Sequence, residues 1–185
     1  MKLFLFLADG GLIINKLKVF FKLHNHLNLD LLTNICLLKD KNWFYGLENQ
    51  LDWIQNNIEV EDIHVLGYIN DKLDAYANLV RRKILINDDF EMTILGIGNV
   101  CVADKGLGMG KFLMEEINNF LLRTKFAGIL LCKNRYVNFY INNNWYLLDN
   151  TILDTDFKTD IVNVMVFNLQ EKINLKSLKI IGKSF

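Results

Sequence analysis

The sequence has 185 residues, 51% of them hydrophobic, and its 21 basic residues balance 21 acidic ones. This length and composition predict one globular domain over residues 1–185 with a sizeable core. Zero net charge without a basic run gives no footprint for nucleic acid, so we expect no such partner. Cys36, Cys101 and Cys132 lack metal-ligand spacing and stand in apolar contexts. They predict buried thiols in a reducing, cytoplasmic compartment and no metal site.

The N-terminal segment, residues 1–15, contains two short apolar runs, one lysine and an Asp9-Gly10-Gly11 break. A signal peptide needs a clean apolar run preceded by basic residues, and a membrane-spanning helix needs about 20 apolar residues. This segment has neither feature. We therefore expect an extra strand or a loose extension here, and no membrane partner.

Hydrophobic periodicity divides the rest of the chain into strands and helices. It predicts a strand over 18–23, helices over 29–38 (with Asn28 as N-cap) and 47–57, and strands over 63–69, 75–86 and 92–102. A helix, a strand over 128–132, a short helix around Tyr140 and strands near 145–148 and 161–169 follow. Residues from Glu171 onward predict a terminal strand or a loose tail. The apolar strand 162–169 could pair with a second copy through an exposed edge, so we expect a monomer or a homodimer.

A glycine-rich loop follows the strand that ends at Val102. Its glycines, at positions 106, 108 and 110, permit positive φ and a close approach of the backbone to a ligand. The helix that starts there directs unpaired N–H groups and the positive end of its dipole toward one spot. Together these features predict an anion site, usually for phosphate.

Two familiar phosphate loops do not fit this segment. A P-loop needs glycine where Lys105 stands and a hydroxyl residue where Phe112 follows Lys111. The dinucleotide-binding motif needs its third glycine one residue later than position 110. Both alternatives fail on chemistry.

The loop does resemble the acyl-CoA loop of the GCN5-related N-acetyltransferases (GNAT), with Lys105 in place of the usual arginine or glutamine. A second motif of that family is matched downstream. Asn134 follows a strand, Phe139-Tyr140 matches the family's Phe-Tyr pair, and Asn144-Trp145 stands for its Gly-Phe. Asparagine suits that place because it tolerates the left-handed conformation that ends a helix.

The resemblance implies an α/β fold with a mixed, mostly antiparallel central sheet flanked by helices, in the order β-α-α-β-β-β-α-β-α-β-β. It implies an acetyl-CoA-dependent N-acetyltransferase that acetylates a primary amine, which we expect on a small molecule such as an amino sugar. Alternatives are an acetyltransferase of protein N-termini or lysines, a CoA-binding regulatory module without turnover, and a binder of nucleotide phosphates. The residues implied to hold acetyl-CoA are Val100, Val102, Lys105, Gly106, Leu107, Gly108, Met109, Gly110, Lys111 and Asn134. Asn134 could instead cap the Tyr140 helix.

Catalytic roles also follow from the resemblance. A backbone amide near Val102 polarises the thioester carbonyl, and Tyr140 protonates the CoA thiolate. A phenol has a reference pKa near 10 and so carries a proton at neutral pH. The alternative for Tyr140 is a plain core residue. Candidates for the base are Glu91, His64 and, as a group that orients water, Asn99.

An aromatic-rich segment over residues 41–46 is expected to form a loop between the two early helices, where the family lines its acceptor site. Trp43 and Tyr45 could stack on a sugar or another ring-shaped amine. Equally, they could hold the two helices together.

Overall fold

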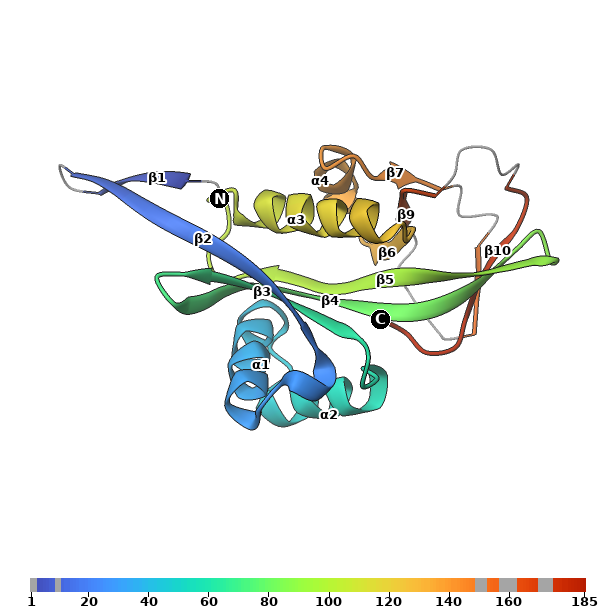
Figure 1. Cartoon of the computed structure of the whole chain (residues 1–185), viewed down its shortest axis with the longest axis horizontal. Helices are drawn as coiled ribbons and strands as arrows, with labels where there is room; N and C mark the ends of the chain where they lie inside the picture. Colours follow the sequence, from blue (N-terminus) through green and yellow to red (C-terminus); the bar gives the residue numbers. More distant parts are fainter. Residues whose placement is uncertain (1–2, 9–10, 149–152, 157–162, 170–174) are drawn as a thin grey trace.

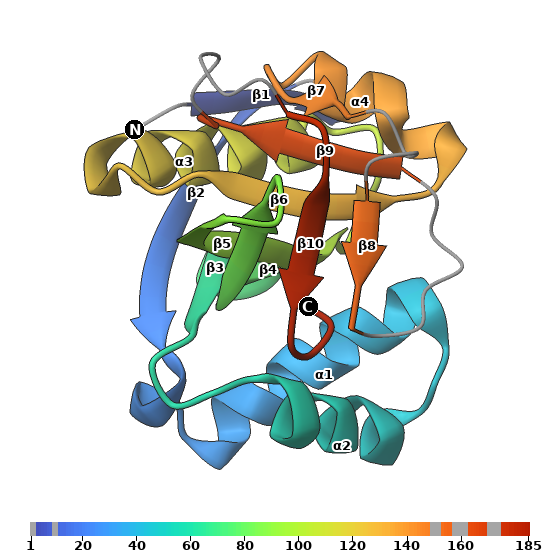
Figure 2. The ribbon, with the colours of Figure 1, turned by 90° about the vertical axis from the view of Figure 1, so that its right-hand side faces the viewer.

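The protein is described from a computed structural model that places residues 3–8, 11–148, 153–156, 163–169 and 175–185. Within these residues a ten-stranded sheet has α1 and α2 on one face and α3 and α4 on the other (Figures 1 and 2). The helices are α1 (Leu29–Trp43), α2 (Leu47–Asn57), α3 (Met109–Thr124) and α4 (Val137–Ile141), with 3-10 turns η1 (His24–His26) and η2 (Asn134–Tyr136). The strands are β1 (Leu3–Ala8), β2 (Gly11–Leu23), β3 (Ile63–Ile69), β4 (Lys72–Ile86), β5 (Phe90–Val102), β6 (Gly128–Cys132), β7 (Tyr146–Leu147), β8 (Leu153–Thr155), β9 (Asn163–Phe167) and β10 (Leu178–Ile181).

The sheet is mixed and mostly antiparallel, which confirms the predicted fold class. Its main order is β1-β2-β3-β4-β5-β6-β9-β7, and the parallel pairs are β5–β6 and β8–β10. β10 lies beside the far end of β4, where β3 has ended: β3 pairs with β4 as far as Leu79, and β10 pairs with Lys83 to Ile86. The C-terminal residues therefore include a strand of the sheet.

Several predicted boundaries agree with the structure and others shift. The elements over 47–57, 63–69 and 128–132 begin and end where the sequence predicts. Asn28 caps α1, because its side chain accepts a hydrogen bond from the Leu31 amide at 3.0 Å. β2 is longer than predicted, since it forms a hairpin with β1, and α1 runs five residues further, to Trp43.

The predicted exposed edge at 162–169 is wrong for the described part of that strand. β9 pairs with β6 on one side and with β7 on the other. Residues 161–162 lie outside the described residues, as do 1–2 and 9–10 of the N-terminal segment and 171–174 of the tail. Because both edges of β9 are occupied, it offers no edge to a second copy.

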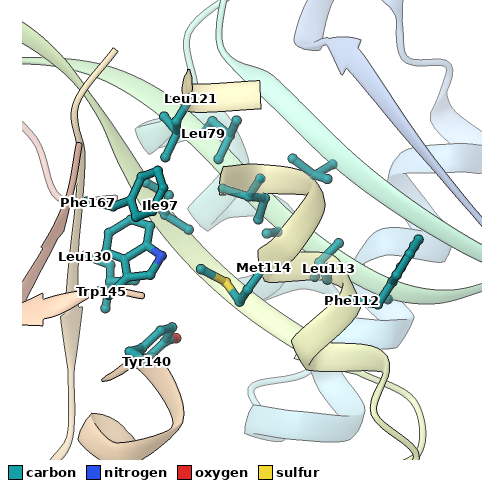
Figure 3. Close-up of a cluster of buried hydrophobic side chains, with 14 of the residues drawn as sticks. Leu79, Ile97, Phe112, Leu113, Met114, Leu121, Leu130, Tyr140, Trp145 and Phe167 are labelled. Carbon is teal, nitrogen blue, oxygen red and sulfur yellow. The ribbon is translucent and has the colours of Figure 1, made fainter. Parts of the chain in front are cut away.

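The core is divided between the two faces of the sheet. The α3 side of β3, β4 and β5 packs on the apolar stripe of α3 and on Tyr140, Trp145 and Phe167, part of which Figure 3 shows. The opposite face carries two clusters, one under α1 and α2 and one under β10. Phe185 packs against both of these clusters.

Candidate functional site

The candidate site begins where β5 and β6 diverge. These parallel strands pair only at Leu95–Gly128 and Gly96–Ile129. Beyond Gly96, β5 continues to Val102 with β4 as its one partner among the described strands. The β4–β5 register shifts near this point, and Asn99 adopts a positive φ of 53°, as in a β-bulge that bends a strand away from its neighbour. The other edge of residues 97–102 is thus left for an extended ligand.

The glycine loop continues directly from this open edge into α3. Gly106 has a φ of 86°, and Gly108, the N-cap of α3, has a φ of 77°. A side chain would strain the backbone at both positions. The Phe112 amide donates to the Gly108 carbonyl at 3.1 Å, so the helix starts at Met109, within the glycine loop. The amides that precede Phe112 are the ones an anion can meet at a helix start.

The side chains of the loop divide into solvent-facing and packed ones. Lys105 and Lys111 are exposed on either side of the glycines, where their charges favour an anion. Met109 is buried and anchors the start of α3 in the core. A Cβ at Gly110 would lie 3.4 Å from the Phe139 ring, so the first turn of α3 approaches α4 closely. The loop and the Phe-Tyr motif are therefore neighbours in space.

Tyr140, the predicted acid, lies on α4 and is 8% exposed. Its ring contacts those of Phe139 and Trp145, with centroids 5.0 and 6.4 Å away. Figure 3 shows Tyr140 and Trp145. Burial, with smaller contributions from Cys132 and Tyr136, raises the pKa of the phenol well above its usual value. Tyr140 is therefore protonated across the whole neutral range. Its reference pKa, used in the sequence argument, understates how strongly it holds the proton.

A hydrogen-bonded anchor that the sequence did not reveal fixes α4 to α3. The Trp145 indole donates to the Asn118 side-chain oxygen at 2.8 Å, and the Asn118 amide donates to the Asn143 carbonyl at 2.8 Å. Asn144 has a φ of 66°, which confirms that it replaces glycine in the left-handed position. The available signal was Asn118 itself, a polar residue on the apolar stripe of α3, between Met114 and Leu121.

Asn134 does not cap the Tyr140 helix. It lies in η2, and neither η2 nor α4 has a side-chain cap. Its side-chain oxygen instead accepts a hydrogen bond from the Asn163 amide at 2.6 Å, which ties the end of β6 to β9. The residue is exposed, and its predicted contact with the pantetheine arm stays a prediction.

Of the three candidate bases, only Asn99 lies at the site. Its side-chain amide donates to the Asn78 oxygen at 2.6 Å, next to the point where the strands diverge. Glu91 lies eleven residues before Val102 on the same strand, about 35 Å away at strand spacing, and pairs with Lys83 at 2.7 Å. The structure therefore contradicts Glu91 as the base.

The structure also contradicts His64 as the base. The ring is fully buried on the α1–α2 face, with Nδ1 2.9 Å from the Tyr76 hydroxyl and Nε2 3.0 Å from Nδ1 of His24. Burial, followed by the charges of His24 and Lys39, lowers its pKa to about 3. Both ring nitrogens have partners, so neither is available to an amine.

Lys39 lies in the same buried region as His64, and it is unusual because a charged side chain is buried there. Its ammonium is 4.3 Å from the centre of the Trp53 ring and has no hydrogen-bond partner among the described residues. The side chain is 1% exposed, and burial lowers its pKa to about 8. The helix predicted from the sequence ended at Leu38, so periodicity gave no sign that Lys39 is helical and faces inward.

Of the two predicted acceptor residues, Tyr45 lies in the expected loop and Trp43 does not. Trp43 belongs to the last turn of α1 and packs against the cluster under α1 and α2, as the alternative interpretation predicted. Tyr45 is in the short loop and is 63% exposed. A groove of about 590 Å³ lies between α1 and the β3–β4 turn, lined by Phe44 and Tyr68 among others, whereas Trp43 and Tyr45 do not line it.

The rest of the described chain adds three findings. Cys36, Cys101 and Cys132 are free and buried, which confirms the predicted thiols, and burial raises the pKa of Cys101 to about 12. In the part of the chain that the structure describes, His, Cys, Asp and Glu side chains nowhere gather in threes that could hold a metal ion. Among the same residues, no helix is both long and apolar enough to cross a membrane.

No protein-family model matches the sequence, and no curated protein matches it. Solved structures, however, match its fold. Escherichia coli YhbS, a GNAT family N-acetyltransferase crystallised with CoA, superposes with a TM-score of 0.63 at 11% identity, over 90% of each chain. An acyl-CoA N-acyltransferase from Pseudomonas aeruginosa (0.59, 18%) and Escherichia coli ElaA (0.58, 20%) each match 82% of this chain and 99% of their own.

The chain therefore has the fold of the GCN5-related N-acetyltransferases, as its two motifs predicted. The diverging strands and the glycine loop lie within that fold as one continuous site.

Proposed function

We propose that the protein is an acetyl-CoA-dependent N-acetyltransferase that acetylates a primary amine of a small molecule. The observation that supports this most is the open edge of β5 beyond Gly96, which leads without interruption into the glycine loop at the start of α3. A ligand with an extended amide-containing arm and a pyrophosphate matches both parts. CoA has this combination, whereas ATP has no such arm.

The residues present fit acetyl-CoA in three ways. The loop amides from Gly106 to Lys111 and the α3 dipole suit the pyrophosphate, and Lys105 and Lys111 add charge. The open edge at Val100 and Val102 suits the amides of the pantetheine arm. That arm is about as long as a few extended residues. Running back along β5 from the loop, it would place the thioester near the bulge at Asn99, three residues before the Val102 amide that the resemblance implied as the polarising group.

The proposed chemistry is a direct transfer. The amine nitrogen bonds to the thioester carbonyl carbon, the carbon–sulfur bond breaks, and its electron pair stays on sulfur. Tyr140 donates its proton to the thiolate, and the proton lost by the amine returns to Tyr140 through water. Burial raises the pKa of Tyr140, and it disfavours the CoA thiolate by the same physics, so the two groups remain matched within the dry site.

The proton from the amine needs an acceptor, and the Asn78–Asn99 pair lies at the bulge where we place the thioester. Amides do not take up protons at neutral pH, so their role is to orient a water molecule. The pair lies on β4 and β5, which are rigid strands of the sheet, and this placement favours a fixed water position.

The experiment that tests this function combines binding and turnover. Thermal unfolding is measured with saturating acetyl-CoA, CoA or ATP, because a ligand at a hundred times its Kd stabilises a fold by about 2.7 kcal/mol. CoA release is then followed with amino sugars, amino alcohols and a lysine-containing peptide as acceptors. We expect stabilisation by both CoA species but not by ATP, and turnover with small amines. Stabilisation by ATP alone, or turnover with the peptide alone, would contradict the proposal.

A further inference from the structure

The last residue of the sequence lies against β5 at the point where β5 and β6 separate. A Cβ built on Gly96 would be 2.6 Å from the Phe185 ring, and one built on Gly98 would be 2.4 Å from the Phe185 backbone carbonyl carbon. Real side chains do not approach so closely, so Phe185 occupies the space that side chains at positions 96 and 98 would fill. Gly96 and Gly98 therefore make room for Phe185 because they have no side chains.

The space that Phe185 fills is on the α1–α2 face of the sheet. Ile97, between the two glycines, packs into the α3-side core, so Gly96 and Gly98 face the other way. Phe185 correspondingly joins the clusters under α1–α2 and under β10. Figures 1 and 2 both show the C-terminus on this side of the sheet, above α1 and α2.

A buried arginine fixes the segment that ends in Phe185. Arg82 donates from Nε to the Lys183 carbonyl and from Nη2 to the Ser184 carbonyl, both at 2.9 Å. Nη2 also donates to the Asn57 carbonyl at the end of α2, at 3.0 Å. Arg82 is 7% exposed, and hydrogen bonds from a buried charged donor are among the stronger ones in proteins. The segment is therefore docked. Of the two alternatives that the sequence left for this end, the terminal strand is present as β10, and a loose tail does not describe residues 183–185.

The two substrates of an acyl transfer have to meet from different sides. In the proposed function, on which this inference rests, acetyl-CoA uses the glycine loop and Tyr140, which belong to the α3–α4 side. On that side, the place where β5 and β6 separate is covered by α3 and by the rings of Tyr140, Trp145 and Phe167. An amine that reaches the thioester must therefore come from the α1–α2 face, where Phe185 lies.

One buried polar atom at this place lacks a partner. The Asn78 side-chain nitrogen is fully buried, has no hydrogen-bond partner among the described residues, and is 3.1 Å from the position of a Cβ on Gly98. An unsatisfied buried donor costs about 1–3 kcal/mol, a cost that an oxygen of a bound ligand can remove. The surroundings of Phe185 thus have its apolar ring over Gly96, and beside Gly98 its backbone carbonyl group and the unused Asn78 donor.

We infer that Phe185 forms one wall of the acceptor pocket and limits the size of the amine that reaches the thioester. The ring covers the α1–α2 side of β5 beside the split, and Arg82 holds it there. Small primary amines that carry an oxygen near the nitrogen fit beside it and can accept from Asn78. Amines that carry a bulky ring two carbons from the reacting nitrogen, as tryptamine does, collide with Phe185.

The test uses two CoA thioethers in which sulfur is joined through –CH2–CO–NH– to ethanolamine or to tryptamine. Each conjugate occupies the cofactor and acceptor sites together, so its affinity, measured by isothermal titration calorimetry, needs no knowledge of the natural amine. Phe185→Ala should lower the ratio of the tryptamine Kd to the ethanolamine Kd about tenfold, since pocket volume discriminates by roughly this much. Phe185→Trp should raise that ratio. CoA itself should bind all variants equally.

Gly98→Ala provides a second route, because its Cβ would displace Phe185, and it should change the ratio in the same direction as Phe185→Ala. Phe90→Ala is the matched control: this phenylalanine is 53% exposed at the opposite end of β5. An unchanged ratio in Phe185→Ala and Gly98→Ala, with CoA still bound, would overturn the acceptor wall alone. Failure of CoA to bind the unaltered protein would overturn the proposed function as well.

Discussion

The two faces of the sheet place their chemistry in different parts of the chain. On the α3–α4 side, the glycine loop spans residues 105–111 and Tyr140 follows within thirty residues. Most of the groups that this side presents to a ligand belong to the backbone: the open edge of β5 and the amides and dipole at the start of α3. On the α1–α2 side, buried polar side chains come together from η1, α1, β3 and β4, and Phe185 comes from the far end of the chain.

This difference explains why sequence motifs predict the site on the α3–α4 side of the sheet but not the clusters on the α1–α2 side. Backbone sites need glycines at fixed spacing, because only glycine permits the required φ values and close approach. A side-chain cluster needs only a suitable residue at each of several positions far apart in the sequence. No motif of fixed local spacing therefore marks it. The two sides should therefore respond differently to substitution: the first through turnover and cofactor affinity, the second through stability and its dependence on pH.

The largest effect is expected on the α3–α4 side, from Tyr140→Phe. Loss of the proton donor should lower kcat by about 10²- to 10⁴-fold, while the Kd of acetyl-CoA stays within about twofold. Steady-state CoA release and calorimetry measure the two quantities. Tyr136→Phe, which changes a tyrosine of the neighbouring η2 turn, is the control and should leave both quantities unchanged. Equal turnover in the two variants would leave Tyr140 as a core residue only.

On the α1–α2 side, Lys39→Met should stabilise the protein. The pKa of Lys39 is lowered from 10.5 to about 8, so below pH 8 the folded state holds a buried charge at a cost of roughly 3 kcal/mol. We expect a gain of about 2 to 3 kcal/mol at pH 7 in urea unfolding. The gain should shrink as pH rises from 8 to 10.5, because the folded protein then releases the proton before the unfolded chain does.

Lys41→Met is the matched control for that experiment, since Lys41 is exposed on the same helix. Its effect should stay within about 0.5 kcal/mol at every pH, as is usual for surface positions. A Lys39→Met variant that behaved like this control would show that the ammonium is hydrated rather than buried.

Low pH should lower the free energy of unfolding through His64, which also lies on the α1–α2 side. Its pKa is about 3 in the fold against 6.5 for a free histidine, so between these values the unfolded state binds the extra proton and stability falls as pH decreases. At pH 4.5 this amounts to about 2.7 kcal/mol.

His64→Gln keeps a hydrogen-bonding group beside Tyr76 but cannot titrate. The loss of unfolding free energy between pH 7 and pH 4.5 should therefore be about 2 to 3 kcal/mol smaller in the variant than in the unaltered protein. Parallel pH profiles for the two proteins would mean that His64 is protonated within the fold.

The smallest effect compares two glycines with positive φ. Gly108→Ala and Gly46→Ala should each destabilise the fold by at least about 1 kcal/mol, because both positions have a positive φ: Gly108 is left-handed (φ 77°, ψ −1°), and Gly46 has a φ of 82° with a ψ of 152°, a combination that essentially only glycine adopts. Only Gly108 lies in the loop, so only Gly108→Ala should also weaken acetyl-CoA binding, by roughly fivefold, as measured by calorimetry. Equal affinity in both variants would mean that the loop is a turn without a ligand.

The sequence by itself determined the order of the main elements and the position of the loop. Apolar periodicity located α2, β3 and β6, and Asn144 marked the left-handed end after α4. These features depend on interactions between residues a few positions apart, such as helical spacing, strand alternation and local φ preferences. The same locality made the glycine loop and the Phe139-Tyr140 pair recognisable.

Only the tertiary structure decided the remaining assignments. It placed Glu91 at the far end of β5, buried His64 between two hydrogen-bonding partners, and moved Trp43 into α1. It also brought Phe185 onto Gly96 and Gly98, more than eighty residues away along the chain. Burial and long-range contact depend on how the sheet and helices pack together. A side chain's exposure, pKa and partners are therefore set by residues that its own stretch of sequence does not contain.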